Sequence, residues 1–562
     1  MRNVRPAACL LAAAVLLWAS GQARAGRFEE FTKKASASRG LKTLAATCFG
    51  SSGVEEFVAA GGQADGTIVA FGNAWGPAFP AAPAPIVLGK GKRYDVPDTT
   101  TDSKGRPVFD RGNPNVAGMI VRFSPDLQKV VGVTRMGWGV ADIETGLVAP
   151  DGGLVIAGRC AEGFASAVGQ APLVKTALSA EDAPAGAAGE TSSKKKTKES
   201  KFGPTAYQGA PVTGDVFVAR LTPDAARFVW VHVLAGHRTP PARLFPDKGG
   251  AILFECNGIK RISADGKTLT PVTPNISEGE RVKVLAVNPA DGTIIHGGDR
   301  NTHTNKEPWR QPFLNCYDAS GQRLWRIWDW DPKSVGADVK KLQSDSACRA
   351  GAIGQNGDFI IGGWSDGGNS VFTRQIKDVD APLPKGLPGY GMSCWGMKGA
   401  NSLAYLMRFD PKTFEMKAWT LWVSYVPQGP DGKGGGNPNF ASIKRIEMLP
   451  DGSVFWYGQA ATGLIQTPQA WFQYAEGAKA GGSYVAVASG DFTNLIFSSY
   501  VPACEVQGIG QAKGGLLVAG RAEAKTEGGL AAPVANAIQK AHGGAQDAHL
   551  ILLESPAPAK GE

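Results

Sequence analysis

The chain has 562 residues, of which 74 are glycine and 43% are hydrophobic, and it carries a formal net charge of +9. Beyond its first residues, no stretch approaches the roughly 20 apolar residues that a membrane span requires, so we expect no span. Part of the positive charge is a lysine cluster inside the Ala/Gly/Ser/Glu-rich segment 179–201. Such clusters are typical of solvated low-complexity loops, and the charge therefore does not predict a nucleic-acid partner.

The N-terminus has the pattern of an export signal. A basic start and an apolar stretch at 7–19 precede the small-x-small cleavage site Ala23-Arg24-Ala25. We expect residues 1–25 to be a signal peptide and 26–40 an N-terminal extension. The mature protein is then predicted to be periplasmic or secreted.

A turn-forming dipeptide followed by a short apolar run recurs along the rest of the chain. A turn of this kind that leads into a β-rich run is typical of a strand entered from a hairpin. Repeated units indicate a solenoid, propeller or array. The dipeptides are Asp65-Gly66, Asp151-Gly152, Lys248-Gly249, Asp291-Gly292, Asn356-Gly357, Asp451-Gly452 and Lys513-Gly514.

Each unit continues with two further apolar runs separated by a turn, which makes four predicted strands per unit. In the second unit these runs are 216–224 and 228–233. The shortest spacing between turn glycines, from Gly249 to Gly292, matches the roughly 40–45 residues of a bare propeller blade. The sequence therefore predicts an all-β fold, a seven-bladed β-propeller with four-stranded blades.

The predicted propeller spans residues 41–555, followed by a C-terminal tail at 556–562. The last unit lacks a fourth strand, and the segment 41–48 precedes the first unit. We expect this segment to supply the missing strand, because closure of the ring removes exposed sheet edges.

Two runs carry a resemblance to a known family. Residues 287–298 (VNPADGTIIHGG) and 353–368 (IGQNGDFIIGGWSDGG) resemble the SBBP and delta-60 type repeats of exported bacterial β-propeller proteins. The resemblance implies an exported propeller, although the third unit lacks the closing glycine of the pattern. Residues 317–321 (YDASG) with the following QRLW also resemble the repeat of quinoprotein-type propellers. A good match to that repeat occurs only once in the chain. It therefore implies a similar pattern of strands and turns within the blade and no bound cofactor.

Long insertions all fall between the predicted second and third strands of a unit. Loops at this position project from one face of a propeller, and insertions on one face often mark a binding face. We call this the insertion-bearing face, and we expect the segment 427–440, which joins two units, to lie on it as well. The insertions are 73–115, 159–214, 298–312, 363–402, 459–483 and 521–547.

The insertions of units four to six carry the candidate ligand-binding residues. Aromatic faces bind sugar rings and cations, and polar neighbours set orientation, so we expect a carbohydrate or a protein as the ligand of a binding or scaffold module. The alternative for each tryptophan is packing against a neighbouring blade. The candidates are His303, Trp309, Arg310, Trp364, Asp366, Trp395 and Trp471.

The sequence shows few of the motifs that are typical of catalytic, metal or cofactor sites. We find no HExxH, CxxC or CxxCH pattern, so the sequence predicts no metal site and no cofactor, and it assigns no catalytic residue. The alternative function is an enzyme, either a quinoprotein-like oxidoreductase or a glycan-acting lyase or hydrolase. Cys348 and Cys504 match in two related units, and we expect both to be packed and not disulfide-bonded.

Overall fold

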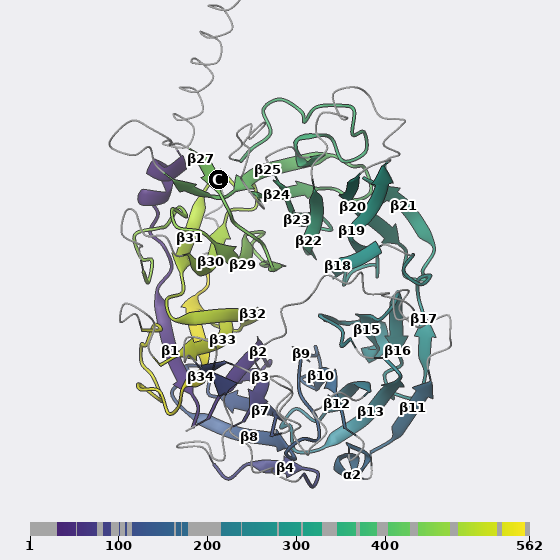
Figure 1. The fold of residues 1–562 in the computed structure, drawn as a ribbon, viewed down its shortest axis with the longest axis vertical. Coiled ribbons are helices and arrows are strands. Elements are labelled where there is room, and N and C mark those ends of the chain that lie inside the picture. The colour runs from purple at the N-terminus through teal and green to yellow at the C-terminus, as the bar shows by residue number, and fades with distance from the viewer. Residues whose placement is uncertain are drawn as a thin grey trace, which may run out of the picture.

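The protein is a closed ring of seven β-sheets, seen down its shortest axis in Figure 1. This computed structural model describes residues 31–556 apart from 52, 76–82, 92–99, 102–106, 109–114, 162–163, 170, 178–214, 238, 278–279, 305–306, 329–344, 367–370, 390–402, 427–436, 473–480 and 525–530. The predicted all-β, seven-bladed propeller is confirmed. The predicted signal peptide and the whole of the segment 179–201 lie outside the described residues.

Each blade contains four antiparallel strands that lie side by side in the order first, second, third and fourth. In blades 1 to 6 this is also their order along the chain, whereas blade 7 takes its fourth strand from the N-terminal segment. Blade 1 is β2 (Glu55–Gly62), β3 (Ile68–Ala74), β7 (Ala117–Phe123) and β8 (Val130–Met136); blade 2 is β9 (Thr145–Val148), β10 (Leu154–Arg159), β12 (Val216–Leu221) and β13 (Phe228–Ala235); blade 3 is β14 (Leu244–Pro246), β15 (Ile252–Glu255), β16 (Ile259–Ile262) and β17 (Leu269–Pro271). Blade 4 is β18 (Glu280–Val287), β19 (Ile294–Thr304), β20 (Glu307–Tyr317) and β21 (Arg323–Ile327); blade 5 is β22 (Ser346–Ile353), β23 (Phe359–Ser365), β24 (Leu403–Phe409) and β25 (Met416–Trp422). Blade 6 is β28 (Arg445–Met448), β29 (Val454–Ala460), β30 (Gly482–Ala488) and β31 (Leu495–Tyr500); blade 7 is β32 (Cys504–Ala512), β33 (Gly515–Glu523), β34 (Gln546–Glu554) and β1 (Thr43–Phe49).

The first strands of neighbouring blades contact one another around the ring, so they line its centre: β2 contacts β9 and β32, and β22 contacts β18 and β28. The insertions of blades 1 and 2 each add a fifth, parallel strand at the outer edge, β4 (Ile86–Leu88) and β11 (Leu173–Ala177). Two small hairpins lie outside the blades, β5 (Thr100–Thr101) with β6 (Pro107–Val108) and β26 (Ser424–Val426) with β27 (Asn437–Asn439).

Helical structure is sparse. Within the described residues, the main helical segments are 31–36, α2 (Phe164–Val168), and the short 3₁₀ turns η2 (Lys248–Gly250) and η4 (Val371–Thr373). Among the described residues, no helix is both long and apolar enough to cross a membrane.

The repeated dipeptides form the hairpins between the first and second strands, as expected. In blade 1, an Asp65 carboxylate oxygen accepts the N–H of Thr67 at 2.8 Å, and Gly66 has φ +93°, which favours glycine. Blade 6 repeats this arrangement, because Asp451 accepts the N–H of Ser453 at 2.9 Å and Gly452 has φ +82°.

One predicted insertion is not a loop. We expected an insertion at 298–312, but β19 and β20 continue through it as one long hairpin, with Asn301 opposite Arg310 and Thr304 opposite Glu307. The physical reason is that polar residues on both strands can pair their backbones as well as apolar ones do, so a polar composition does not end a ladder. The other insertions do lie between the second and third strands of a blade, but their first residues, such as 363–365 in β23, still belong to the second strand.

The core lies mostly between the blades. Trp422 of blade 5 packs edge-to-face on Trp456 of blade 6, with ring centroids 4.9 Å apart, and lies 5.9 Å from Tyr484. Every residue of β3 and of β23 is buried. A middle strand is buried on both sides because each blade is covered by its two neighbours.

The ring is closed by β1, which is the outermost strand of blade 7. It pairs antiparallel with β34 from Thr43 opposite Leu553 to Phe49 opposite Ala548. Figure 1 shows the purple N-terminal strand beside the yellow C-terminal one. The predicted closure by an N-terminal strand is therefore confirmed.

One arginine links four blades at the centre of the ring. Arg243, directly before β14, donates to the carbonyls of Leu285 (3.3 Å) and Gly351 (2.9 Å) and to the carboxylate of Glu447 (3.2 Å). Burial lowers the pKa of Arg243 to about 10, with a further contribution from Arg445, so the group stays charged at neutral pH.

We predict that breaking the β1–β34 pairing opens the ring. Ala46 and Cys48 donate their N–H groups to Ala535 and Gln539, so alternation along the strand directs the N–H of Ala45 towards β34. Ala45→Pro should therefore lower the free energy of unfolding by about 3 kcal/mol. The measurement is a denaturant titration followed by tryptophan fluorescence, and Ala45→Gly, which keeps the N–H, is the matched control. Equal loss in both variants would show that the pairing does not limit stability.

We predict that Arg243→Met destabilises the protein by about 3 kcal/mol, because it leaves two buried carbonyls without their donor. Arg39→Met is the control, because Arg39 also pairs with a glutamate (Glu554, 2.9 Å) but its side chain is 72% exposed. That exposed pair should contribute about 0–1 kcal/mol. A comparable loss from both variants in the same unfolding titration would contradict a special role for Arg243.

Candidate functional site

Three of the predicted site residues meet in a cavity of about 550 Å³ on the insertion-bearing face. Arg310 comes from β20 of blade 4, and Trp364 and Asp366 lie at the end of β23 in blade 5. The segment 442–444, just before β28 of blade 6, forms the remaining wall. The lining residues are Arg310, Arg349, Trp364, Asp366, Ser442, Ile443 and Lys444.

Arg349 reaches the cavity from a β-bulge. On β22 the register passes from Cys348 opposite Gly363 directly to Ala350 opposite Gly362, so Arg349 is the extra residue. A bulge of this kind redirects a side chain relative to the regular alternation of the strand. In three other blades the first strand, β2, β18 or β32, also has a register shift where it pairs with the second strand. A β-bulge therefore recurs in the inner strands.

The Arg349 guanidinium lies between an aromatic ring and a carboxylate. Its centre is 5.3 Å from the centre of the Trp364 ring, and one nitrogen is 3.4 Å from Oδ1 of Asp299. Asp299 is fully buried and also pairs with Arg281, whose Nε donates to Oδ2 at 2.9 Å. Burial lowers the pKa of Arg349, while the Asp299 carboxylate opposes that effect and favours the charged form.

The Trp364 ring does not offer an open stacking surface. Trp364 is only 7% exposed, and the guanidinium of Arg349 covers its ring. The aromatic face that the sequence analysis expected Trp364 to offer a ligand is therefore largely covered by the protein itself. What the cavity presents to solvent at this point is a cation held in place by an aromatic ring.

Arg310 and Asp366 are tied together by Asp345. The backbone N–H of Arg310 donates to Oδ1 of Asp345 at 3.0 Å, and its guanidinium Nε is 3.7 Å from Oδ2. The N–H of Asp366 donates to the Asp345 carbonyl at 2.9 Å. Lys444 is exposed, and its ammonium has no ion-pair partner among the residues that the structure describes. The cavity therefore gathers three cationic side chains from three blades.

The other predicted site residues do not line this cavity. Trp471 packs edge-to-face on Phe497 and donates its indole N–H to Oγ1 of Thr43 at 2.7 Å, which fixes it against β1. His303 and Trp309 occupy the tip of the β19–β20 hairpin, where only their backbone is described. Trp395 lies outside the described residues.

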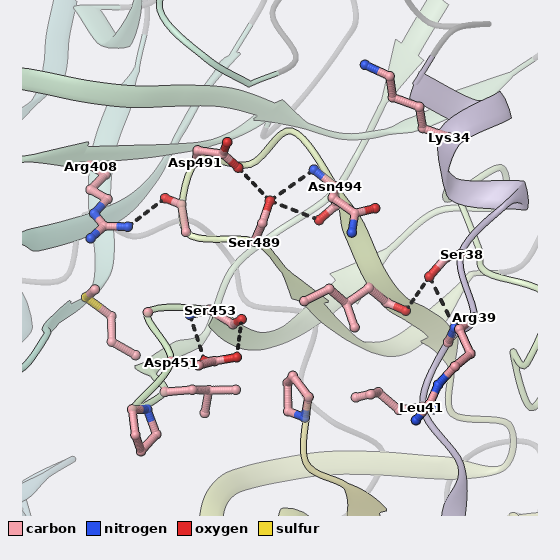
Figure 2. A pocket seen from close by; sticks show the side chains of 18 of the residues that line it. Lys34, Ser38, Arg39, Leu41, Arg408, Asp451, Ser453, Ser489, Asp491 and Asn494 are labelled. Carbon is pink, nitrogen blue, oxygen red and sulfur yellow. Dashed lines mark hydrogen bonds between the residues drawn. The ribbon is translucent and has the colours of Figure 1, made fainter. Parts of the chain in front are cut away.

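Figure 2 shows a larger cavity, of about 1130 Å³. Its lining includes turns that join the first strand to the second and the third to the fourth, so it lies on the face opposite the insertions. The N-terminal segment 34–41 borders it, together with the hairpin turns of blades 5 and 6. Its polar groups are mostly engaged in those turns, since Asp451 and Asp491 hold Ser453 and Ser489 in hydrogen bonds that also occur in other blades. We therefore place the candidate site in the smaller cavity, where the side chains are not part of the repeated turn chemistry.

The described cysteines are buried and none of them is disulfide-bonded, which agrees with the expectation for Cys348 and Cys504. The sequence pointed to Arg310, Trp364 and Asp366 through their composition and loop position. It gave no signal for Arg349 or Lys444. Arg349 is directed by a register shift, and Lys444 is one exposed lysine among many.

Comparison with known proteins assigns neither a family nor a function to the chain. No family model matches the chain, and no curated protein is similar to it, so the resemblance to SBBP and delta-60 repeats stays a prediction. Among solved structures it is similar to a protein of unknown function from Dyadobacter fermentans (12% identity, 92% of this chain and 100% of that one, TM-score 0.37). It is also similar to the hydrazine synthase of Kuenenia stuttgartiensis (9% identity, 73% and 90%, TM-score 0.36) and to Sqt1 of Chaetomium thermophilum (8% identity, 92% and 100%, TM-score 0.39).

Proposed function

We propose that the protein is a binding module whose cavity on the insertion-bearing face takes a carboxylate-bearing carbohydrate. The observation that carries the proposal is the convergence of Arg310, Arg349 and Lys444 on one cavity. A guanidinium presents a planar fork of donors that matches a carboxylate, and an ammonium adds a point charge. Three such groups favour an anionic ligand over a neutral one.

The size of the cavity favours a sugar over a protein surface. About 550 Å³ lies within the roughly 300–1,000 Å³ range of small-ligand pockets, whereas a stable protein interface is an extended patch. Ser442 and Asp366 add a hydroxyl and a carboxylate at the wall, which suit the hydroxyl groups of a sugar ring. A protein ligand with exposed acidic side chains is the alternative partner.

We also propose that the protein is exported, and export would be consistent with this function. The predicted signal peptide would place the protein in the periplasm or outside the cell, where acidic polysaccharides are accessible. The alternative of an oxidoreductase, or of a glycan-acting lyase or hydrolase, stays a prediction from the sequence.

The test is calorimetric titration with oligogalacturonate, using the uncharged galactose oligomer of the same length as the control ligand. We expect the charged oligomer to bind and the uncharged one to bind at least tenfold more weakly. Arg310→Ala and Lys444→Ala should each weaken binding by roughly 10- to 100-fold, because a hydrogen bond to a charged group contributes about 1.5–3 kcal/mol.

Trp471→Phe is the matched control variant, because it alters a predicted site residue that the structure places away from the cavity. It should leave binding unchanged. Arg349→Lys keeps the charge beside Asp299 and tests the fork geometry without leaving that carboxylate unpaired. Equal binding of both oligomers, or binding of poly-glutamate in place of both, would contradict the carbohydrate assignment.

A further inference from the structure

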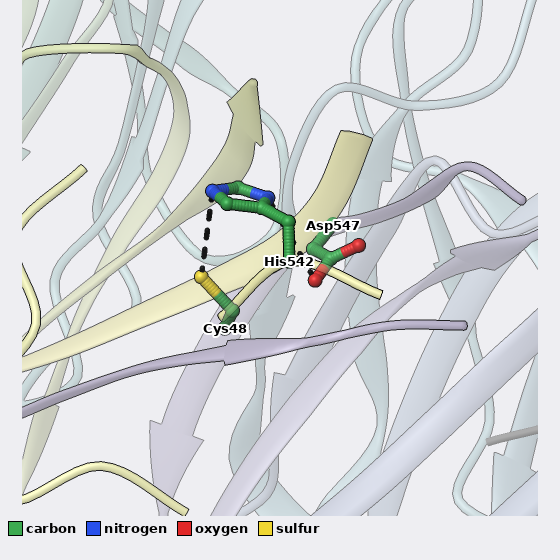
Figure 3. A group of neighbouring side chains, drawn as sticks. All are labelled: Cys48, His542 and Asp547. Carbon is green, nitrogen blue, oxygen red and sulfur yellow. Dashed lines mark hydrogen bonds and ion pairs between the residues drawn. The ribbon is translucent and has the colours of Figure 1, made fainter. Parts of the chain in front are cut away.

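Three side chains with different metal-ligand chemistry meet at the outer edge of blade 7, as Figure 3 shows. Cys48 comes from β1 and Asp547 from the start of β34, while His542 lies in the loop that leads into β34. One donor atom of each residue lies within 4.8 Å of the other two. Cys48 and His542 are 494 positions apart in the chain, so no local spacing motif marks the group.

The imidazole of His542 lies between the other two groups. Its Nε2 is 3.9 Å from Sγ of Cys48, and its Nδ1 is 3.7 Å from Oδ2 of Asp547. That Nδ1 is buried and makes no hydrogen bond within the described part of the chain. A buried polar atom without a partner lowers the stability of the folded protein by about 1–3 kcal/mol. We therefore expect the Nδ1 atom to have a partner in the native protein.

The carboxylate of Asp547 is oriented by backbone and amide donors. Oδ2 accepts from the N–H of Gly543 (2.9 Å) and from the side chain of Gln539 (2.8 Å), and Oδ1 accepts from Gly544 (3.3 Å). A carboxylate has about four acceptor positions, so these contacts leave room for one more ligand. Donors that hold a ligand in this way are the usual surroundings of a protein metal site.

Two buried carboxyl groups lie close together at this place, and such a pair suits a bound cation. Asp547 is fully buried, and its ion-pair partner among the described residues is His542. A second fully buried carboxylate is close: a Cβ on Gly50 would lie 2.4 Å from Oδ1 of Asp547 and 2.6 Å from Oε2 of Glu55. A divalent cation bound to one thiolate and one carboxylate would make the ligand set neutral.

We propose that Cys48, His542 and Asp547 bind one divalent metal ion of the zinc class. A mixed sulfur, nitrogen and oxygen set is typical of zinc, whereas calcium and magnesium take oxygen ligands. Ligand atoms around one zinc ion lie about 3.5 Å apart, and the donor atoms here lie within 4.8 Å of one another, so the metal-free group needs a contraction of up to about 1.3 Å. His542 lies in a loop and can make that movement, and the fourth position is left for water.

The rival interpretation is a thiol–imidazole–carboxylate triad that acts on a substrate. Cys48 is only 1% exposed, so a substrate would not reach its sulfur in this conformation. A metal ion, by contrast, needs only a transient opening of the loop at 541–545. The burial therefore favours the metal.

The test uses full-length protein, stripped with a chelator and titrated with Zn²⁺ by calorimetry and with Co²⁺ by absorbance. We expect one equivalent of each metal, and a thiolate-to-cobalt charge-transfer band in the near ultraviolet. Cys48→Ser should abolish the band, and His542→Ala should weaken Zn²⁺ binding at least tenfold. Because His542 is on a loop, its variant should fold even if a change on β1 does not.

Cys504→Ser is the matched control. Cys504 is also a buried thiol of blade 7 beside a histidine, with Sγ 3.8 Å from Nδ1 of His549, but the other nitrogen of that histidine contacts the carbonyl of Pro533 and no carboxylate. The control should keep the band and the stoichiometry. Absence of stoichiometric metal binding in the wild type, or a band that survives Cys48→Ser, would overturn the proposal. Rapid alkylation of Cys48 by iodoacetamide in folded, metal-free protein that is lost in His542→Ala would instead support the triad.

Discussion

The pairing of β1 with β34 is the constraint on which the rest of the structure depends. Each blade buries its apolar faces only against its two neighbours, so a ring with a gap would expose two blade faces at once. The pairing places the two ends of the described chain in one sheet and leaves no blade without a neighbour. Arg243 adds a second connection at the centre, where it joins inner strands that share no backbone hydrogen bonds. Geometry at any single cavity therefore depends on the whole ring.

The two faces of this ring differ in how their polar groups are used. On the face with the hairpin turns, the same Asp and Ser hydrogen bonds recur from blade to blade, and they satisfy the turn itself. On the insertion-bearing face, side chains such as Arg310 and Arg349 are specific to their blade. The repeated face is fixed by the requirements of folding, and the other face is where individual side chains can change without loss of the fold. This difference, more than cavity size, locates the candidate site.

The fold could be predicted from the sequence because its signals are local. A turn dipeptide such as Asp65-Gly66 constrains a turn of four residues, and the seven copies of the dipeptide predict seven blades. Counting the strands in each unit then shows that the last unit lacks its fourth strand. The site could be predicted only in part. Arg310, Trp364 and Asp366 share a cavity as expected, but Trp471 has the same composition signal and packs against β1. The position of the Arg349 side chain in the cavity depends on a one-residue register shift. The contact between Cys48 and His542 joins residues that are 494 positions apart. Neither feature leaves a local pattern in the sequence.

The closing strand has a consequence for the way the chain must fold. β1 precedes and β34 follows the strands of all six other blades, so blade 7 cannot be completed until those blades have been synthesised. In entropy alone, joining segments some 500 residues apart costs only about 2 kcal/mol more than joining segments 50 apart. In time, however, such a distant contact forms late, and until then the edges of β1 and β34 are open to pairing with other chains. The ring that protects the finished molecule thus imposes a vulnerable interval during its biosynthesis.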